Sequence, residues 1–149
     1  MKYIESPMEW DGIGNSLFLA GGITGCPSWQ QEMVQLLSDT PLVLLNPCRV
    51  QFPICDLTAA RAQIAWEFEH LRKADAILFW FPAETVCPIA LYELGAWSMT
   101  NKPLFVGVHP SYVRRQDVEI QTGLARPDIK ITFTLATLAE MVMQWSIAP

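Results

Sequence analysis

The sequence predicts an α/β fold in which helices cover both faces of a parallel sheet of four to five strands. Short runs of consecutive apolar residues alternate along the chain with helical patterns. Apolar runs without polar alternation are typical of strands buried on both faces, and strand–helix–strand units form parallel sheets through right-handed crossovers. The chain has 149 residues, of which 51% are hydrophobic, and we expect one domain that spans residues 1–149.

Five segments are candidates for strands. Four are runs of consecutive apolar residues, and Val118–Ile131 is a candidate for a short fifth strand. The four runs are Leu17–Ala20, Leu42–Leu45, Ala76–Phe81 and Leu104–Val108.

Four helices are expected between and after these strands. Pro88 is a favoured first residue for the third helix, and Pro103 follows its end. Thr134 suits the N-cap of the last helix. In the second helix, apolar Ile64 and Phe68 fall on one side and Glu67 on another. The expected ranges are 28–39, Thr58–Lys73, 88–101 and Leu135–Trp145.

Charge and composition exclude several classes of protein. Lys and Arg number 10 against 15 Asp and Glu, so the net charge is −5, whereas binding to a nucleic-acid backbone depends on clustered cations. No apolar run approaches the ~20 residues that cross a bilayer. The segment Met1 to Trp10 contains Glu5 and Glu9 and resembles no signal peptide. We therefore expect a cytoplasmic protein that binds neither nucleic acid nor membrane.

The four cysteines are expected to be reduced thiols in that compartment. They include no C-x-x-C pair and are widely spaced, so no metal site is expected. They are Cys26, Cys48, Cys55 and Cys87.

The loop after the first strand is a candidate for ligand binding, because ligands of open α/β sheets bind at the carboxyl ends of the strands. It contains Gly21, Gly22, Ile23, Thr24 and Gly25. Glycines let backbone N–H groups approach a ligand closely, and the next helix offers its positive end. The loop fits a phosphate or a hydroxyl-rich sugar, or simply a tight turn. It matches neither the dinucleotide fingerprint nor a Walker loop.

Two further loops supply candidate substrate-binding residues. Asn46 follows the second strand and suits either a ligand contact or a cap of its own turn. Arg49 is a nearby cation. Pro82, Glu84 and Thr85 follow the third strand.

Two carboxylates on neighbouring helices are the candidates for catalysis. Glu67 follows Trp66, a candidate for contact with the substrate, and partial desolvation there would raise the pKa of Glu67 toward a value useful for acid–base work. A solvated carboxylate on the polar side of the helix is the alternative. Glu93 lies in an apolar stretch near a helix N-terminus, where the helix dipole helps a nucleophilic carboxylate stay ionised.

Five stretches of the chain share a pattern with one known family, in the same order. They are FLAGGITGCPSWQ (Phe18–Gln30), NPCRVQFPI (Asn46–Ile54), QIAWEFEHLRKADAILFWFPAET (Gln63–Thr85), PIALYELGAWS (Pro88–Ser98) and GVHPSYVRRQDVEIQ (Gly107–Gln121). Together they resemble the nucleoside 2-deoxyribosyltransferase-like family, and most closely its small single-domain branch.

The resemblance implies a flavodoxin-like, three-layer αβα fold with a doubly wound sheet, and cleavage of the N-glycosidic bond of a (deoxy)nucleoside or nucleotide. Glu93, in the E-L-G motif, is then the nucleophile that forms a glycosyl–glutamate intermediate. Glu67, eight residues before Asp75, is its acidic partner. The sugar contacts Gly21–Gly25 and passes to another base or to water. No metal or organic cofactor is implied, and family members commonly form homo-oligomers, dimers or larger, in which a neighbour helps close the site.

Two features of well-studied transferases are absent from the matching positions. They are a tyrosine in the first strand or loop, and an aspartate in the loop before the E-L-G helix, where this chain has Glu84, Thr85 and Cys87. A non-catalytic nucleotide-binding or sensor module is therefore the alternative hypothesis. A flavin-binding flavodoxin ranks last, because the first loop lacks a Ser/Thr-rich phosphate cradle.

Overall fold

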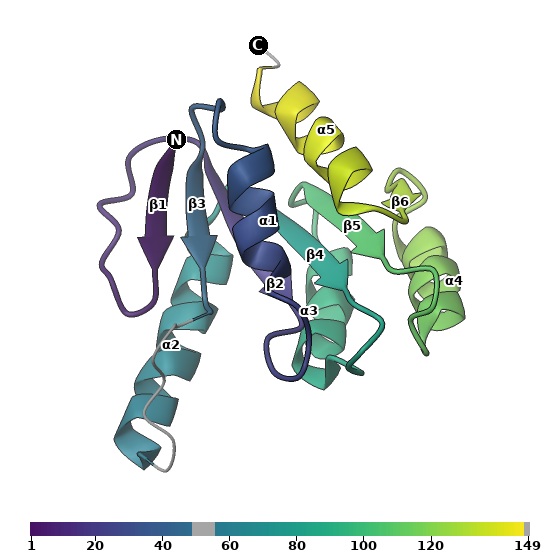
Figure 1. Ribbon diagram of the computed structural model, residues 1–149, viewed down its shortest axis with the longest axis horizontal. Helices are drawn as coiled ribbons and strands as arrows, with labels where there is room; N and C mark the ends of the chain where they lie inside the picture. Colours follow the sequence, from purple (N-terminus) through teal and green to yellow (C-terminus); the bar gives the residue numbers. More distant parts are fainter. Residues whose placement is uncertain (49–55, 148–149) are drawn as a thin grey trace.

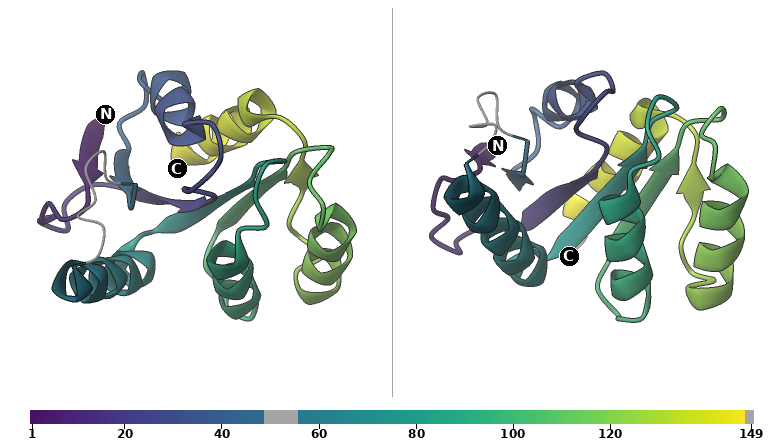
Figure 2. Two further views of the ribbon diagram at one scale, coloured as in Figure 1. Left: turned by 60° about the horizontal axis from the view of Figure 1, so that its bottom comes forward. Right: turned by 90° about the horizontal axis from the view of Figure 1, so that it is seen from below.

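The computed structural model describes residues 1–48 and 56–147. Within these residues the chain forms a six-stranded parallel sheet with helices on both faces (Figure 1; Figure 2). This confirms the predicted three-layer α/β fold. Arg49, a predicted substrate-binding residue, and Cys55 lie outside the described residues.

The strand order is that of a flavodoxin-like sheet with one additional edge strand. The order is β1-β3-β2-β4-β5-β6, and every neighbouring pair is parallel. Without β1, it is the 2-1-3-4-5 order of flavodoxin-like folds. The strands are β1 (Lys2–Glu5), β2 (Ser16–Gly21), β3 (Val43–Asn46), β4 (Ala76–Phe81), β5 (Leu104–Val108) and β6 (Ile131–Thr132).

Two parts of the sheet differ from the prediction of four to five strands. Strand β1 was not predicted, because only Ile4 of its four residues is buried and it forms no apolar run. The segment Val118–Ile131 was predicted to add a short fifth strand, and it reaches one only at its last residue. Helix α4 (Arg115–Ala125) occupies the first part of that segment, and only Ile131 belongs to β6.

The four predicted helices are confirmed to within a few residues, and α4 is added to them. Thr134 is the N-cap of the last helix, as predicted, because its side chain accepts a hydrogen bond from Thr137 N. No helix in the described parts of the chain is long and apolar enough to cross a membrane. The other helices are α1 (Trp29–Leu36), α2 (Leu57–Lys73), α3 (Pro88–Ser98) and α5 (Leu135–Ser146).

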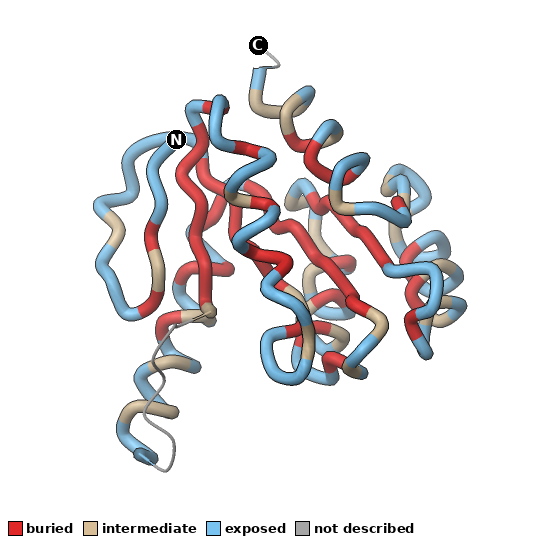
Figure 3. The backbone as a smooth tube through the Cα atoms, in the orientation of Figure 1, coloured by how far each residue is buried: buried red, intermediate tan, exposed pale blue. Residues whose placement is uncertain are grey.

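The sheet separates two apolar cores. Helices α1 and α5 cover one face, and α2, α3 and α4 cover the other (Figure 2). Successive residues of a strand point to opposite faces. In β2, Leu17 and Leu19 therefore pack in the core under α1 and α5, whereas Phe18 and Ala20 pack in the core under α2 and α3. The four central strands are buried over nearly their whole length (Figure 3).

Helix α2 packs by a different side from the one that its apolar residues indicate. Ile64 and Phe68 are exposed, whereas Trp66 and His70 are buried. The His70 ring stacks on the Trp66 ring with centroids 3.9 Å apart, and His70 Nδ1 lies 2.8 Å from Trp66 O. Because α2 packs by the side that carries Trp66 and His70, Glu67 is partly buried at the boundary of the core and not on a fully solvated face.

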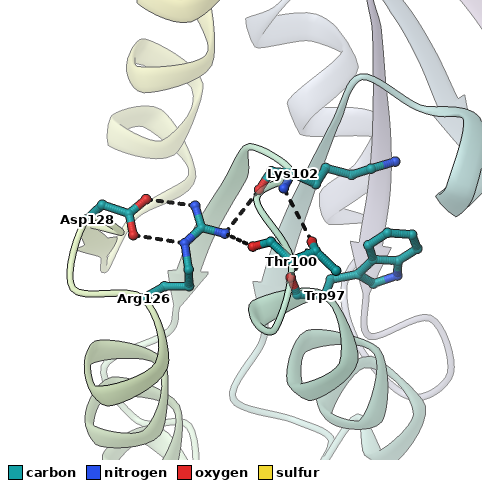
Figure 4. A network of polar contacts seen from close by, with 5 residues as sticks. All are labelled: Trp97, Thr100, Lys102, Arg126 and Asp128. Carbon is teal, nitrogen blue, oxygen red and sulfur yellow. Dashed lines mark hydrogen bonds and ion pairs between the residues drawn. The ribbon is translucent and has the colours of Figure 1, made fainter.

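Polar side chains connect the loops at the amino edge of the sheet. Lys102 Nζ donates to three carbonyl oxygens at the C-terminal end of α2, at 2.6–2.9 Å, and lies 4.6 Å from the centre of the Trp97 ring. Arg126 donates to the carbonyls of Thr100 and Lys102 and pairs with both oxygens of Asp128 (Figure 4). These contacts hold α2, α3 and α4 together at the amino edge of the sheet.

Candidate active site

A cavity of about 280 Å³ lies at the carboxyl edge of the sheet, on the side of α2 and α3. Its size is near the lower end for small-molecule pockets, which measure roughly 300–1,000 Å³. The loops that follow β2, β3 and β4 surround it, and α2 and α3 each contribute a carboxylate. The predicted site residues that line it are Gly21, Gly22, Ile23, Thr24, Glu67, Thr85 and Glu93.

A second groove, of about 320 Å³, lies between α3 and α4. Its charged lining residues are Arg114 and Asp117, which form an exposed ion pair at 3.2 Å. Among the described residues, Asp117 is its one carboxylate and Arg114 its one residue from a loop that follows a strand. The cavity that contains Glu67 and Glu93 is therefore the candidate active site.

The Glu93 carboxylate lies in a desolvated and electronegative position. Burial, and to a lesser extent the nearby Glu67 carboxylate, raise the pKa of Glu93 to about 7. No hydrogen bond reaches this carboxylate from the part of the chain that the structure describes. Its ionised form is therefore destabilised in the free protein, as is common for groups at functional sites.

The Glu67 carboxylate is half-buried and accepts a hydrogen bond from Gln63. Gln63 Nε2 donates to its Oε1 at 2.7 Å. Burial raises the pKa of Glu67, and the hydrogen bond from Gln63 acts in the opposite direction. Since two carboxyl groups with raised pKa values line the same cavity, they titrate as a pair, and the first proton to leave makes loss of the second harder.

The first two glycines of the β2–α1 loop allow the loop to pack closely. A Cβ atom at Gly21 would lie 2.3 Å from Trp80 O, and one at Gly22 would lie 2.8–3.0 Å from side chains of the β4–α3 loop. The Gly22 carbonyl accepts hydrogen bonds from Trp29 Nε1 at 2.7 Å and Gln30 Nε2 at 3.1 Å. Both donors are buried. The backbone that lines the cavity at these two glycines is therefore packed closely on both sides.

The next three residues expose backbone donors. Ile23 and Thr24 line the cavity, and Gly25 follows them with a positive φ of 74°. Within residues 1–48 and 56–147, the N–H groups of these three residues donate no hydrogen bond. They are available to oxygen atoms of a ligand, which fits the predicted role of the loop.

Five predicted substrate-binding residues do not line the cavity. The Asn46 side chain donates to Tyr3 Oη at 2.8 Å and accepts from Cys48 N at 2.9 Å, so it caps its own turn, one of its two predicted roles. The Trp66 indole donates to Met8 O at 3.0 Å. Both polar groups are thus occupied within the fold. The five residues are Gly25, Asn46, Trp66, Pro82 and Glu84.

Several residues of the site were not predicted. Phe18 lines the cavity, and the alternation of β2 could have identified it. Cys87 also lines it, at the left-handed residue before Pro88, and burial raises the pKa of its thiol to about 11. Tyr112 is buried after β5, and its hydroxyl donates to Val86 O at 2.6 Å, which holds the β4–α3 loop. Nothing in the sequence pattern indicates the contact between Tyr112 and Val86.

Residues 14–112 of the chain match the family described as "Nucleoside 2-deoxyribosyltransferase like". No curated protein matches the chain. The matched residues include every element that lines the cavity, from β2 to α3, and exclude β1. In the described residues, no cluster of three His, Cys, Asp or Glu side chains is suited to hold a metal ion.

Proposed function

We propose a function from the premise that this chain belongs to the nucleoside 2-deoxyribosyltransferase-like family. The protein cleaves the N-glycosidic bond of a (deoxy)nucleoside or nucleotide and passes the sugar to another base or to water. The observation that carries this proposal is the pair of carboxyl groups, Glu67 and Glu93, which line one small cavity and both have raised pKa values.

Glu93 is the proposed nucleophile. Its carboxylate oxygen attacks the anomeric carbon as the bond from that carbon to the base nitrogen breaks. The base leaves with the electron pair of that bond and takes a proton from Glu67. The product of this step is a glycosyl ester of Glu93, formed through a transition state with oxocarbenium character.

The second step regenerates the carboxyl pair. A nitrogen of a second base, or the oxygen of water, attacks the anomeric carbon and displaces the Glu93 carboxylate. Glu67, now ionised, accepts the proton that the attacking group loses. Two displacements at one carbon give net retention, as in retaining glycosidases.

The reactive form of the pair carries a single proton. Catalysis needs this proton on Glu67, whereas burial and the nearby Glu67 carboxylate raise the pKa of Glu93 to about 7 and so oppose ionisation of Glu93 in the free protein. A base that accepts a hydrogen bond from Glu67 shifts the proton toward Glu67 and lets Glu93 ionise. Substrate binding and activation of the nucleophile are coupled in this way.

The β2–α1 loop supports recognition of the sugar. Ile23 and Thr24 line the cavity, and their open N–H groups suit the hydroxyl or 5′ oxygen atoms of a nucleoside. Backbone donors bind such oxygens without a charged side chain, in keeping with the acidic composition of the chain.

The direct test incubates the protein with a panel of nucleosides and their 5′-monophosphates and measures free base by chromatography. The proposal predicts base release by the wild type and none by Glu93→Gln, with both proteins folded. Adding a second free base separates transfer from hydrolysis, because transfer yields a new nucleoside. Ligand binding without base release across the panel would instead support the non-catalytic sensor.

Assembly into a homo-oligomer is also part of the proposal. The exposed side chains of Leu57, Ile64 and Phe68 on α2 support it, because contiguous exposed apolar surface often marks an interface. Sedimentation equilibrium should then give a mass of at least twice that of one chain. A mass equal to that of one chain would contradict the proposed homo-oligomer.

A further inference from the structure

The side chain of Gln63 joins three parts of the chain next to the candidate active site. Gln63 lies one helical turn before Glu67 on α2, so the two side chains lie on one side of the helix. Gln63 Nε2 donates to Glu67 Oε1 at 2.7 Å and to Pro47 O at 2.8 Å. Gln63 Oε1 accepts a hydrogen bond from Ser6 Oγ at 2.7 Å.

These partners fix the orientation of the Gln63 amide. A backbone carbonyl can only accept, so the amide nitrogen must face Pro47 O. The second hydrogen of the same nitrogen then points to Glu67, and the amide oxygen faces the Ser6 hydroxyl. Ser6 is buried, and its N–H donates to Asn46 O at 3.0 Å. The orientation therefore does not depend on whether Glu67 is ionised.

The fixed amide makes the two oxygens of Glu67 unequal. Both hydrogens of Gln63 Nε2 are used and the nitrogen cannot accept, so Glu67 Oε1 faces a donor in either protonation state. A proton on Glu67 must then reside on Oε2. No described residue hydrogen-bonds Oε2, which leaves it available to a ligand in the cavity.

We propose that Gln63 is a positioning residue that keeps the acid proton of Glu67 on Oε2, where it meets the departing base, with Ser6 and the Pro47 carbonyl holding the amide. The inference rests on the proposed function and deepens it. Gln63 touches neither the cavity nor the reacting atoms, and it acts only through Glu67.

The hydrogen bonds from Ser6 to Gln63 and from Gln63 to Glu67 also give a role to strand β1, which lies outside the matched residues 14–112. Ser6 follows β1 directly, and the same segment is held on α2 by the hydrogen bond from Trp66 Nε1 to Met8 O at 3.0 Å. The side chains of Ser6 and Gln63 therefore connect β1 to Glu67, the proposed general acid.

The test replaces Gln63 with methionine, which keeps the length of the side chain and removes the amide. The proposal predicts that kcat for base release falls about 10–100-fold, the loss typical when a hydrogen-bond partner that orients a metal ligand is removed, while KM stays within about twofold. Ser6→Ala should change kcat in the same direction and by less, because the Pro47 carbonyl still orients the amide. Gln31→Met, at an exposed position of α1, is the matched control.

A second measurement follows Glu67 without reference to activity. Carboxyl carbon NMR of the labelled protein, assigned with Glu67→Gln, gives the pKa of Glu67. Gln63→Met should raise that pKa, because the donated hydrogen bond favours the ionised form. Glu93 on α3 is the charged group that faces Glu67 from a neighbouring element in the described structure, and because the two carboxyl groups titrate as a pair, the measurement is repeated in the Glu93→Gln background.

A lower kcat with an unchanged KM and a raised pKa of Glu67 supports the inference. An unchanged kcat, or an unchanged titration of Glu67 in folded Gln63→Met protein, overturns it. Failure of the proposed function looks different. In that case the wild type releases no base, or Glu93→Gln and Glu67→Gln leave base release unaltered, whatever Gln63→Met does to the titration.

Discussion

Replacing Glu93 with glutamine should stabilise the folded protein above neutral pH while abolishing base release. Glutamine has nearly the same shape as glutamate and carries no charge. The described structure gives the Glu93 carboxylate no hydrogen bond to lose, and Glu67 repels it. The variant therefore removes an unfavourable buried charge and no favourable contact.

The magnitude follows from the pKa of Glu93, which rises from 4.5 to about 7. A raised pKa means that the protonated form fits the folded state better than the ionised form. The resulting stability is fully present below pH 4.5 and is lost as the pH rises through about 7. At ~1.36 kcal/mol per pKa unit, the loss is at most ~3.4 kcal/mol. Because the side chain keeps some contact with water, we expect about 2 kcal/mol.

Urea unfolding at pH 5 and pH 8, followed by tryptophan fluorescence, measures this difference. The free energy of unfolding of Glu93→Gln should exceed that of the wild type by about 2 kcal/mol at pH 8 and by less than about 1 kcal/mol at pH 5. In a thermal scan at pH 8, its melting temperature should be ~4–8 °C higher. Glu140→Gln makes the same chemical change at an exposed position of α5 and should alter stability by under about 0.5 kcal/mol.

A gain of stability that is equal at both pH values would refute the electrostatic reasoning, because only the ionised form of Glu93 is destabilised. A loss of stability at pH 8 would refute it more strongly. That result would mean that the Glu93 carboxylate has a favourable partner in the folded protein.

Four further predictions test other parts of the structure. If one proton on the carboxyl pair is required, kcat/KM should pass through a maximum and fall above about pH 7, and a plateau extending to pH 9 would contradict the role of Glu67. Gly22→Ala should lower the free energy of unfolding by about 1–3 kcal/mol, because the added Cβ overpacks against the β4–α3 loop. At Gly25 an added Cβ has no atom within 4 Å but φ is positive, so Gly25→Ala should lower the free energy of unfolding by only about 1 kcal/mol. Lys102→Met removes three hydrogen bonds to carbonyl oxygens. It should therefore lower the free energy of unfolding in urea by about 2 kcal/mol and leave base release unchanged. The Cys87 thiol, with a pKa raised to about 11, should react with iodoacetamide at pH 7.5 far more slowly than free cysteine, and rapid labelling seen by peptide mass spectrometry would contradict its buried position.

The central strands could be predicted from the sequence because a parallel sheet covered on both faces requires consecutive apolar residues. Ala76–Phe81 shows this directly, since every residue in it is buried. Strand β1 lies at the edge, where a single buried residue, Ile4, is sufficient to anchor it. Such a strand leaves no apolar run to recognise.

The helices show where a local pattern stops being informative. Helix α4 buries Val118 and Thr122, and a threonine on the inner side hides the expected apolar spacing. Helix α2 buries His70 by stacking it on Trp66, while Phe68 remains exposed. In both helices, contacts with distant residues decide which side faces inward.

The candidate site was predictable where the chemistry depends on a motif and not where it depends on packing. The glycine loop, Glu67 and Glu93 follow from the resemblance and from their positions after strands or on helices. The capping role of Asn46 depends on Tyr3, which belongs to the unpredicted strand β1. The contact between Gln63 and Ser6 joins residues 57 positions apart, and no local pattern indicates it.

The most direct test of the proposed mechanism is to detect the glycosyl–Glu93 ester itself. A nucleoside with fluorine at the 2′ carbon slows breakdown of the ester, because fluorine destabilises the oxocarbenium-like transition state. After acid quenching and digestion, mass spectrometry should find the fluorinated pentose on the peptide that contains Glu93, and on no peptide of Glu93→Gln. Continued release of base from nucleosides with no sugar adduct, or an adduct on another residue, would contradict the mechanism.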